Sequence, residues 1–311
     1  MKYAIGVDIG GTKIGVVLGN RNGTLLVRRE ISTLLNRGAR GCLNQLLHTI
    51  EGIIRERGMT SRDLLGIGVG APGAVNSRKG ILPRSPNLPG WTNIPLRGIL
   101  ARRFKLPVYL ANDANAAALG ELMFGAGKSA RHFIYITVST GVGSGIVIDG
   151  KLYEGAGFVA GEFGHVSIVP DGLKCHCGRR GCLEAYASGT AIARFYGKSG
   201  KKKVEGAKGV GIAARLGDKT AIKSYRKAAY YLGIGIAGLM NVLNPEVIVI
   251  GGGVLKSAPA IYWKEMIQSA KSHAWPEAFC STRVLKSTIL DRSGDLGALA
   301  LVFRNSAPGR T

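Results

Sequence analysis

Three of the five cysteines in this 311-residue chain fall within eight residues, at Cys175, Cys177 and Cys182. Three thiolates at this spacing, together with one histidine, form a tetrahedral Cys₃His donor set for zinc. Two histidines compete for the fourth position, His176 inside the cluster and His165 upstream of it. We favour His165, because ligands from adjacent residues would close a cramped ring. Four protein ligands leave no open coordination position, so the predicted Zn²⁺ is structural rather than catalytic.

Carboxylates flank the cysteine cluster on both sides, at Glu162 and Glu184. Each can be an ordinary surface charge, but a loop braced by a metal is a rigid support for a binding site. Carboxylates accept hydrogen bonds from neighbouring hydroxyl groups such as those of a sugar, and Asn87 in the loop 85–91 adds an amide that donates and accepts. These side chains therefore indicate a sugar-binding site.

A further carboxylate, Asp113, follows an apolar strand predicted over 106–110 and stands where a helix is predicted to begin. Asn112 or Asp113 can serve simply as the N-cap of that helix, a role that stabilises a helix by about 1 kcal/mol. The alternative is a catalytic role, in which the carboxylate of Asp113 accepts the proton of an attacking hydroxyl group. The residues alone leave both interpretations open.

Glycine-rich segments follow two other predicted strands, at 10–13 after Asp8 and at 139–145. Paired glycines let the backbone approach a ligand closely and direct N–H groups at an anion. Asp8 is a candidate for holding Mg²⁺ through water. A plain hairpin turn is the alternative for 10–13, but two such segments, one in each half of the chain, predict a clamp on the phosphates of a nucleotide.

The elements that must position these residues occur twice. A strand, a glycine-rich turn, a second strand and a hairpin are predicted over 2–29 and again over 133–153. Apolar residues at helical spacing predict helices over 43–57 and 221–243, and further short strands are predicted over 65–70, 106–110 and 246–250. We expect two related α/β domains at 1–115 and 116–294, with a helix at about 295–311 packing back on the first.

The chain is strongly basic, with 42 Lys and Arg against 19 Asp and Glu. Eleven of these cations fall in 194–227, a run more typical of a solvated face than of a nucleic-acid site. No zinc-finger spacing and no RNP sequence is present, so no specific nucleic-acid partner is expected. No apolar run approaches the length of a bilayer span, and no signal peptide is recognised, which favours a cytoplasmic protein.

The segments 8–13, 112–113, 161–184 and 249–253 together resemble the ROK family (repressors, open reading frames, kinases), and within it the bacterial ATP-dependent glucokinases. The resemblance runs over about residues 2–304. It implies the actin-like ATPase fold, an α/β fold with two related domains around a cleft. It also implies transfer of the γ-phosphoryl group of ATP to the C6 hydroxyl group of a hexose, most of all glucose, with Mg²⁺ as cofactor.

The resemblance also assigns roles to residues. Asp113 would be the catalytic base. The sugar ligands would be Asn112, Glu162, His165 and Glu184, to which the residue types add Asn87 and Asp113 itself. The ligands of the structural zinc would be His165, Cys175, Cys177 and Cys182. The nucleotide and its Mg²⁺ would be bound by Asp8, Gly10, Gly11, Thr12, Lys13, Ser139, Thr140, Gly141, Gly251, Gly252 and Gly253.

Several alternatives remain at this stage. The acceptor can be another hexose or an N-acetylhexosamine, such as mannose, fructose, N-acetylglucosamine or N-acetylmannosamine. The positive charge permits polyphosphate as a donor in place of ATP. A sugar-responsive regulator without catalysis is a further alternative, against which stand the acid at position 113 and the expected lack of a DNA-binding segment. The resemblance implies a homodimer or homotetramer.

Overall fold

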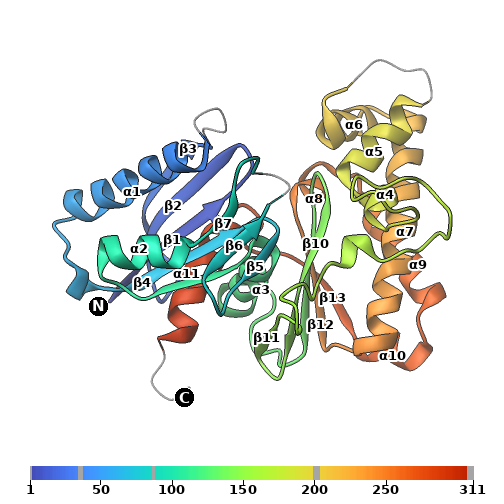
Figure 1. Cartoon of the computed structure of the whole chain (residues 1–311). Helices are drawn as coiled ribbons and strands as arrows, with labels where there is room; N and C mark the ends of the chain where they lie inside the picture. Colours follow the sequence, from blue (N-terminus) through green and yellow to red (C-terminus); the bar gives the residue numbers. More distant parts are fainter. Residues whose placement is uncertain (1, 34–37, 86–87, 199–203, 307–311) are drawn as a thin grey trace. The chain divides into compact units, whose positions relative to one another are not determined.

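The computed structural model describes residues 2–33, 38–85, 88–198 and 204–306 (Figure 1). Its contacts divide the chain into two compact units. Unit 1 takes its described residues from Met1–Ser129, Leu152–Ala160 and Asp291–Thr311, and unit 2 takes them from Ala130–Lys151 and Gly161–Leu290. The boundary expected after residue 115 differs from this division, because it falls inside a helix that packs wholly within unit 1.

Unit 1 is built on a five-stranded sheet of order β3-β2-β1-β4-β8. β1, β2 and β3 are antiparallel neighbours, whereas β4 is parallel to β1 and β8 is parallel to β4. The strands are β1 (Tyr3–Ile9), β2 (Lys13–Asn20), β3 (Leu25–Ser32), β4 (Leu64–Ala71) and β8 (Val108–Asn112). The carboxyl ends of β1, β4 and β8 therefore meet at one edge of the sheet, where Asp8 and Asp113 are found.

A second five-stranded sheet, of order β11-β10-β9-β12-β13, repeats this topology; its strands belong to unit 2 except for Leu152 and Tyr153 of β11. β9 and β10 are antiparallel, and β12 is parallel both to β9 and to β13. The strands are β9 (Phe133–Val138), β10 (Val142–Ile148), β11 (Lys151–Tyr153), β12 (Val247–Gly251) and β13 (Arg283–Lys286). The predicted pair of related α/β domains is confirmed, and it carries the same strand order in both halves.

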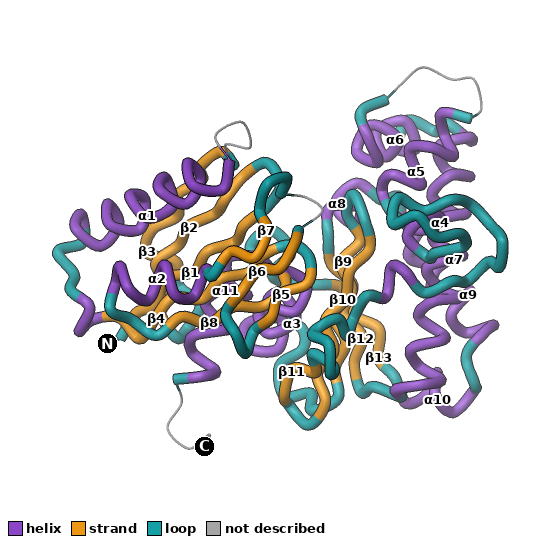
Figure 2. Tube along the Cα trace, in the orientation of Figure 1, coloured by secondary structure: helices purple, strands orange, loops and turns teal. Residues whose placement is uncertain are grey.

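Helices cover both faces of the first sheet (Figures 1 and 2). The helices of unit 1 are α1 (Gly38–Glu56), η2 (Ser61–Asp63), α2 (Leu96–Phe104), α3 (Asp113–Phe124) and α11 (Ser293–Asn305). Ile5 and Val7 of β1 belong to a buried cluster with residues of α1 and α2, whereas Gly6 between them lies against Ala298 of α11. The alternation of β1 therefore directs its large side chains to one helical layer and leaves room for close approach of the other.

A small third sheet was not expected from the sequence. It has the order β5-β6-β7 and follows β4 in the chain. Its strands are β5 (Ala74–Asn76), β6 (Ile81–Arg84) and β7 (Thr92–Ile94). Strands this short carry little hydrophobic periodicity, which is why the pattern does not reveal them.

The helices of unit 2 pack mainly around α7 (Lys219–Leu243), which makes its most extensive helix contacts with α9 (Ala260–His273). Asp218 caps α7, accepting hydrogen bonds from the N–H groups of Thr220 and Ala221, and Asn244 ends it in a left-handed conformation. The remaining helices are η3 (Phe163–His165), α4 (Glu184–Ala187), α5 (Gly189–Gly197), α6 (Gly206–Arg215), α8 (Gly253–Ser257) and α10 (Pro276–Ser281).

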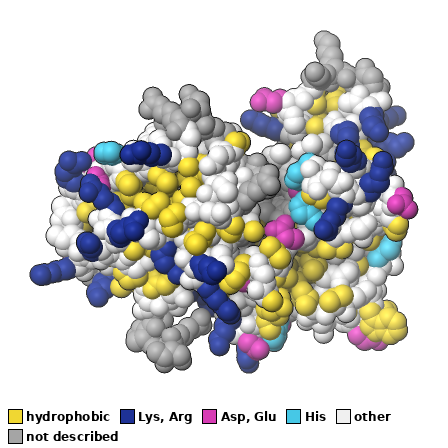
Figure 3. All heavy atoms as spheres, in the orientation of Figure 1, with side chains coloured by type: hydrophobic (Ala, Val, Ile, Leu, Met, Phe, Trp, Pro, Cys, Tyr) yellow, Lys and Arg dark blue, Asp and Glu magenta, His cyan; other side chains and the backbone are white. Residues whose placement is uncertain are grey.

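In the view of Figure 3, Lys and Arg side chains are spread over the surface of each unit. The basic run expected at 194–227 has its described cations on α5, α6 and α7, and most of them are exposed. Lys201, Lys202 and Lys203 lie outside the described residues. No helix in the described part of the chain is both long enough and apolar enough to cross a membrane.

The contact between α3 and α11 depends on glycine. An added Cβ on Gly297 would come within 2.5 Å of the carbonyl oxygen of Ala116, and one on Gly120 would come within 2.9 Å of the nitrogen of Gly297. Because these neighbours are backbone atoms, no side chain can move aside to make room. We therefore expect Gly297→Ala to lower the free energy of unfolding by roughly 1–3 kcal/mol, measured by urea denaturation.

Gly98 of α2 is the matched control, because an added Cβ there would meet nothing within 4 Å. Gly98→Ala should leave the protein unchanged or stabilise it by up to about 1 kcal/mol, since alanine is the better helix former. Equal unfolding midpoints for the two variants would show that the helices do not need this close approach.

Candidate functional site

Asp8 lies near the carboxyl end of β1, with its carboxylate enclosed by glycine backbone. A side chain on Gly294, at the beginning of α11, would overlap Asp8 Oδ2, and Gly70 of β4 also lies close to this carboxylate. Glycines of two separate elements, α11 and β4, therefore leave the space that the carboxylate fills. All of these residues belong to unit 1. The arrangement brings the beginning of α11 to the carboxyl end of β1.

The pKa of Asp8 is raised from 3.8 to about 7, mainly by burial and further by the negative charges of Asp113 and Asp295, while the positive charge of Arg28 lowers it. Asp295 is buried and accepts a hydrogen bond from Arg28 Nε at 2.7 Å. Asp8 is thus held close to a change of protonation state at neutral pH. A cation such as Mg²⁺ in its neighbourhood would favour the ionised form.

Asn112 and Asp113 form the junction between β8 and α3. Asn112 is the N-cap: its Oδ1 accepts hydrogen bonds from the N–H groups of Ala114 at 2.9 Å and Asn115 at 3.3 Å. Its Nδ2 donates to the carbonyl oxygen of Gly73. Asp113 is exposed at the first residue of the helix, and its Oδ1 accepts from the N–H of Ala114 at 2.8 Å. The capping role therefore belongs to Asn112, and Asp113 is an exposed carboxylate beside it.

The segment Gly10–Lys13 is the tight connection between β1 and β2. The N–H of Gly10 donates to the carbonyl oxygen of Lys13 at 2.9 Å, and the hydroxyl of Thr33 donates to the carbonyl oxygen of Gly10. Lys13 pairs with Glu30 at 2.5 Å. Gly11 and Thr12 are accessible at the tip. The segment forms a hairpin turn, which was one of its two interpretations. Its contact with phosphate groups stays a prediction.

In unit 2, the two glycine-rich segments expected at the nucleotide lie together. Ser139–Gly141 follows β9 and Gly251–Gly253 ends β12, and these two strands are parallel neighbours. Ser139 Oγ accepts a hydrogen bond from the N–H of Gly253 at 2.9 Å. Gly252 has φ +94°, and an added Cβ would come within 2.4 Å of the backbone of Val138, so only glycine fits there. The pair forms a surface of backbone groups at the carboxyl ends of parallel strands, where ligands of open α/β sheets bind.

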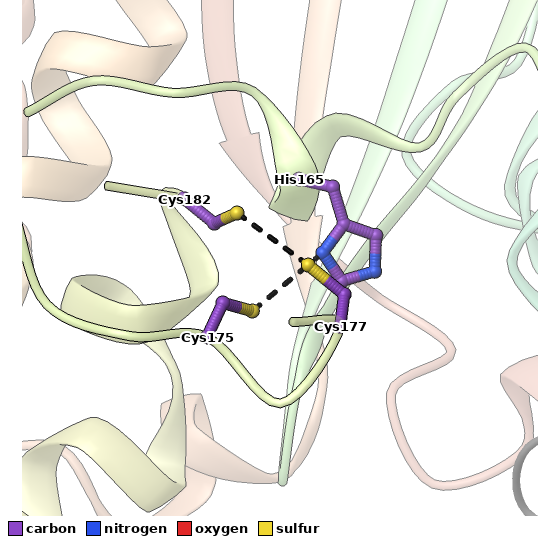
Figure 4. Close-up of side chains that lie close together, drawn as sticks. All are labelled: His165, Cys175, Cys177 and Cys182. Carbon is purple, nitrogen blue, oxygen red and sulfur yellow. Dashed lines mark hydrogen bonds between the residues drawn. The ribbon is translucent and has the colours of Figure 1, made fainter. Parts of the chain in front are cut away.

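The cysteine cluster is assembled as the spacing predicted (Figure 4). Cys175 Sγ lies 3.8 Å from His165 Nδ1, and Cys177 Sγ lies 3.7 Å from Cys182 Sγ. All four candidate ligand atoms lie within 4.8 Å of one another. A tetrahedral zinc with Zn–S bonds of about 2.3 Å would hold its sulfurs about 3.8 Å apart, so these residues fit the metal.

The thiols themselves agree with a metal site. All five cysteines are free, and the sulfur separations in the cluster are far too long for a disulfide. Burial raises the pKa of Cys175 to about 12. Such a thiol stays protonated at neutral pH unless a cation displaces the proton, which is the chemistry of a zinc ligand.

Two carboxylates stand beside this cluster. Glu184, the first residue of α4, is buried; its Oε2 accepts a hydrogen bond from the N–H of Val142 at 2.9 Å, and its Oε1 lies 2.8 Å from His176 Nδ1. Glu162 is more exposed and lies 3.9 Å from His165 Nε2. His165 thus lies near both carboxylates, with Glu162 beside η3 and Glu184 at the beginning of α4. The contact of His176 with Glu184 was not anticipated, because only a metal role was considered for this histidine.

Three further residues bear on the site: one that was predicted for it and two that the sequence analysis did not consider. Asn87 lies outside the described residues. Asp295 and Arg28 were not considered, although an acid in the first turn of an otherwise apolar helix is a recognisable sequence signal. The partner of that acid is 267 residues away in the chain, and no local pattern reveals it.

The two sheets have the same strand order, and a glycine-rich turn follows β1 in one and β9 in the other. This arrangement is that of the actin-like ATPase fold. Residues 4–305 match the ROK family, and the chain belongs to that family. Glucokinase of Thermotoga maritima is 35% identical over 311 residues, which cover 96% of each protein. The xylose repressor of Caldicellulosiruptor bescii is 33% identical, and the alignment covers 96% of this chain and 77% of the repressor.

A solved structure extends the comparison to ligands. It is the ROK family glucokinase of Streptomyces griseus in complex with glucose and AMPPNP. It is 34% identical to this chain, covers 97% of it and 99% of its own length, and superimposes with a TM-score of 0.82.

The raised pKa of Asp8 has a consequence for stability. The folded protein binds this proton more tightly than the unfolded chain between pH 3.8 and about 7, so the carboxylate destabilises the fold increasingly as the pH rises through that window. Asp8→Asn removes this effect. We expect the variant to gain up to about 4 kcal/mol of unfolding free energy relative to wild type between pH 4 and pH 8.

The measurement is urea denaturation of both proteins at pH 4, 6 and 8 with a chelator present, so that no cation shifts the carboxylate. A constant difference between the two proteins at all three pH values would contradict the raised pKa.

Proposed function

We propose that the protein is a hexose kinase that transfers the γ-phosphoryl group of ATP to the C6 hydroxyl group of glucose. The observation that carries the proposal is the full-length similarity to the Thermotoga glucokinase. The glucose and AMPPNP in the Streptomyces structure support glucose and ATP as the substrates.

Asp113 is the proposed catalytic base. Its exposed carboxylate stands at the N-terminus of α3, where it accepts a hydrogen bond from the N–H of Ala114. An ionised carboxylate accepts the proton of the sugar hydroxyl as that oxygen attacks phosphorus. Asn112 supports it indirectly, because capping α3 fixes the backbone on which Asp113 stands.

The phosphate-binding roles fall to backbone groups and Asp8. The turns Gly10–Lys13, Ser139–Gly141 and Gly251–Gly253 present amides that offset phosphate charge as it develops. Mg²⁺, when bound, would neutralise the phosphate oxygens of ATP, and Asp8 is the residue proposed to hold it. Lys13 is a weaker candidate for a phosphate contact, because Glu30 already neutralises it.

The proposed sugar ligands of unit 2 are Glu162, His165 and Glu184. Glu162 and Glu184 accept hydrogen bonds from sugar hydroxyl groups, whereas His165, bound to zinc through Nδ1, would donate one from Nε2. The zinc proposed at His165, Cys175, Cys177 and Cys182 fixes the segment that carries these side chains. The zinc has no open position, so it takes no part in bond making. Asn112 and Asn87 remain predicted sugar contacts.

Further assignments rest on the same family membership. A cytoplasmic location is proposed, in keeping with five free thiols. A homodimer or homotetramer is the proposed assembly. A kinase for another hexose or N-acetylhexosamine, polyphosphate as donor, and a regulator that binds sugar without turnover are the competing proposals.

The test is a coupled ADP-release assay with ATP and glucose, mannose, fructose, N-acetylglucosamine or N-acetylmannosamine. The expected result is turnover with the highest kcat/KM for glucose. The same sugars with polyphosphate in place of ATP test the donor. Glucose binding without product from either donor would support the regulator and overturn the kinase.

Asp113→Asn should lower kcat by about 10²–10⁴-fold, because the amide cannot accept the hydroxyl proton, and leave glucose affinity within a small factor. Asp149→Asn is the control: Asp149 is exposed in a hairpin turn of unit 2, at a left-handed φ that asparagine tolerates. Near-wild-type turnover in Asp113→Asn would remove this residue from the catalytic role.

Cys177→Ser should lose zinc and glucose binding together, because a hydroxyl is a poor replacement for a thiolate ligand. Cys280→Ser is its control, since Cys280 is exposed and lies outside the cluster. Zinc content by elemental analysis and glucose binding by calorimetry are the measurements. A zinc-free Cys177→Ser protein that binds glucose normally would refute the supporting role of the metal.

A further inference from the structure

We infer that His176 is a positioning residue for sugar binding: it holds the outer oxygen of Glu184 in the orientation that a sugar hydroxyl group meets. The inference rests on the proposed function, in which Glu184 binds the sugar. His176 itself is neither one of the proposed sugar ligands nor one of the favoured zinc ligands.

The carboxylate of Glu184 is fixed at both oxygens by different means. Oε2 accepts the N–H of Val142 at 2.9 Å and lies against Gly141, where any side chain would overlap it. Oε1 lies 2.8 Å from Nδ1 of His176. An ionised carboxylate only accepts hydrogen bonds, so the imidazole nitrogen is the donor.

His176 is the accessible member of this pair. Its side chain is 69% exposed, whereas that of Glu184 is 11% exposed. Oε2 of Glu184 is turned to the backbone of Val142. Oε1, the outer oxygen, lies between the exposed imidazole of His176 and the Sγ of Cys175, which is 3.8 Å away. A carboxylate oxygen accepts more than one hydrogen bond, so the contact with His176 leaves capacity for a sugar hydroxyl group.

The backbone beneath His176 is rigid, which a positioning role requires. Cys175 and Gly178 close a turn around it, with the N–H of Gly178 donating to the carbonyl oxygen of Cys175 at 3.1 Å. The N–H of Cys175 donates to the carbonyl oxygen of Arg179 at 2.8 Å. Gly178 has φ +92°, a conformation that glycine adopts without strain. The turn therefore holds the backbone from which the imidazole of His176 reaches Glu184.

His176 has a competing role as a metal ligand. Its Nδ1 lies 3.9 Å from Cys175 Sγ, and His165, His176 and Glu184 form a second group whose ligand atoms lie within 4.8 Å of one another. The three cysteines with His165 already make a complete tetrahedral set, and the shortest polar contact of His176 is with Glu184. If His176 is a metal ligand, replacing it removes the metal. If it is a positioning residue, replacing it weakens sugar binding alone.

The experiment compares His176→Ala with His176→Asn in the full-length enzyme. The amide nitrogen of asparagine is as many bonds from the backbone as Nδ1 of histidine, so Asn restores the donor. For His176→Ala we expect KM for glucose to rise about tenfold, the effect of losing one hydrogen bond to a charged group. Turnover, KM for ATP and zinc content should stay within about twofold of wild type, and His176→Asn should recover most of the glucose affinity.

Deoxy analogues of glucose make the test specific. The rise in KM caused by His176→Ala should disappear for the analogue that lacks the hydroxyl group bound by Glu184, and persist for the others. A change in loop stability would raise KM for every analogue alike. An unchanged KM for glucose in His176→Ala, equal losses in the Ala and Asn variants, or loss of zinc in His176→Ala would each overturn the inference.

The outcome is separable from that of the proposed function. Active wild-type enzyme with an indifferent His176→Ala variant refutes the positioning role and leaves the kinase in place. A wild-type protein that phosphorylates no hexose overturns the proposed function and this inference with it.

Discussion

The close approach of α11 to the first sheet is the constraint on which unit 1 depends. Glycines on β1, β4 and α3 let the backbone of this helix come within van der Waals contact of theirs, at Gly6, Gly68 and Gly120. The same approach brings Gly294 onto the carboxylate of Asp8 and buries Asp295 beside Arg28. Packing and electrostatics are therefore inseparable here, because the helix that closes the core also supplies the charge that acts on Asp8.

Unit 2 solves the problem of holding functional side chains by another means. The stretch between η3 and α4 has little regular structure, with isolated β-bridges joining Ser167 to Cys182 and Lys174 to Arg180. A loop of this kind buries few apolar side chains of its own and would be costly to order. The donor set of His165 and three cysteines offers a metal in addition to the small hydrophobic cluster around Cys175 and Cys182, and the carboxylates stand at either end of the stretch that the metal would tie.

Much of the architecture followed from the sequence because the signals were local. The two hairpin repeats, the helix ending at Asn244 and the strand over 133–138 agree with the structure to within a few residues. In each case alternation, a turn dipeptide or a proline marked the element. The proximity of His165 to the cysteines also followed, since metal ligands have characteristic spacings.

What escaped prediction was non-local. α3 is buried along nearly its whole length, so it has no polar face to reveal its orientation, and the boundary at residue 115 cut through it. The pair of Arg28 and Asp295 joins residues from opposite ends of the chain. His176 was weighed as a metal ligand because of its two cysteine neighbours, and its actual partner, Glu184, becomes visible only when the loop is folded.

The order of the two units along the chain has a bearing on biosynthesis. The residues of α11 are translated after all of unit 2, yet they complete a helical layer of unit 1. Until they emerge from the ribosome, Gly68 and its neighbours on β1 and β4 lack the helix that covers them. The described residues of unit 2 are all translated before α11. Unit 2 can therefore reach its native packing first, whereas unit 1, most of which is synthesised earlier, must wait for the end of translation.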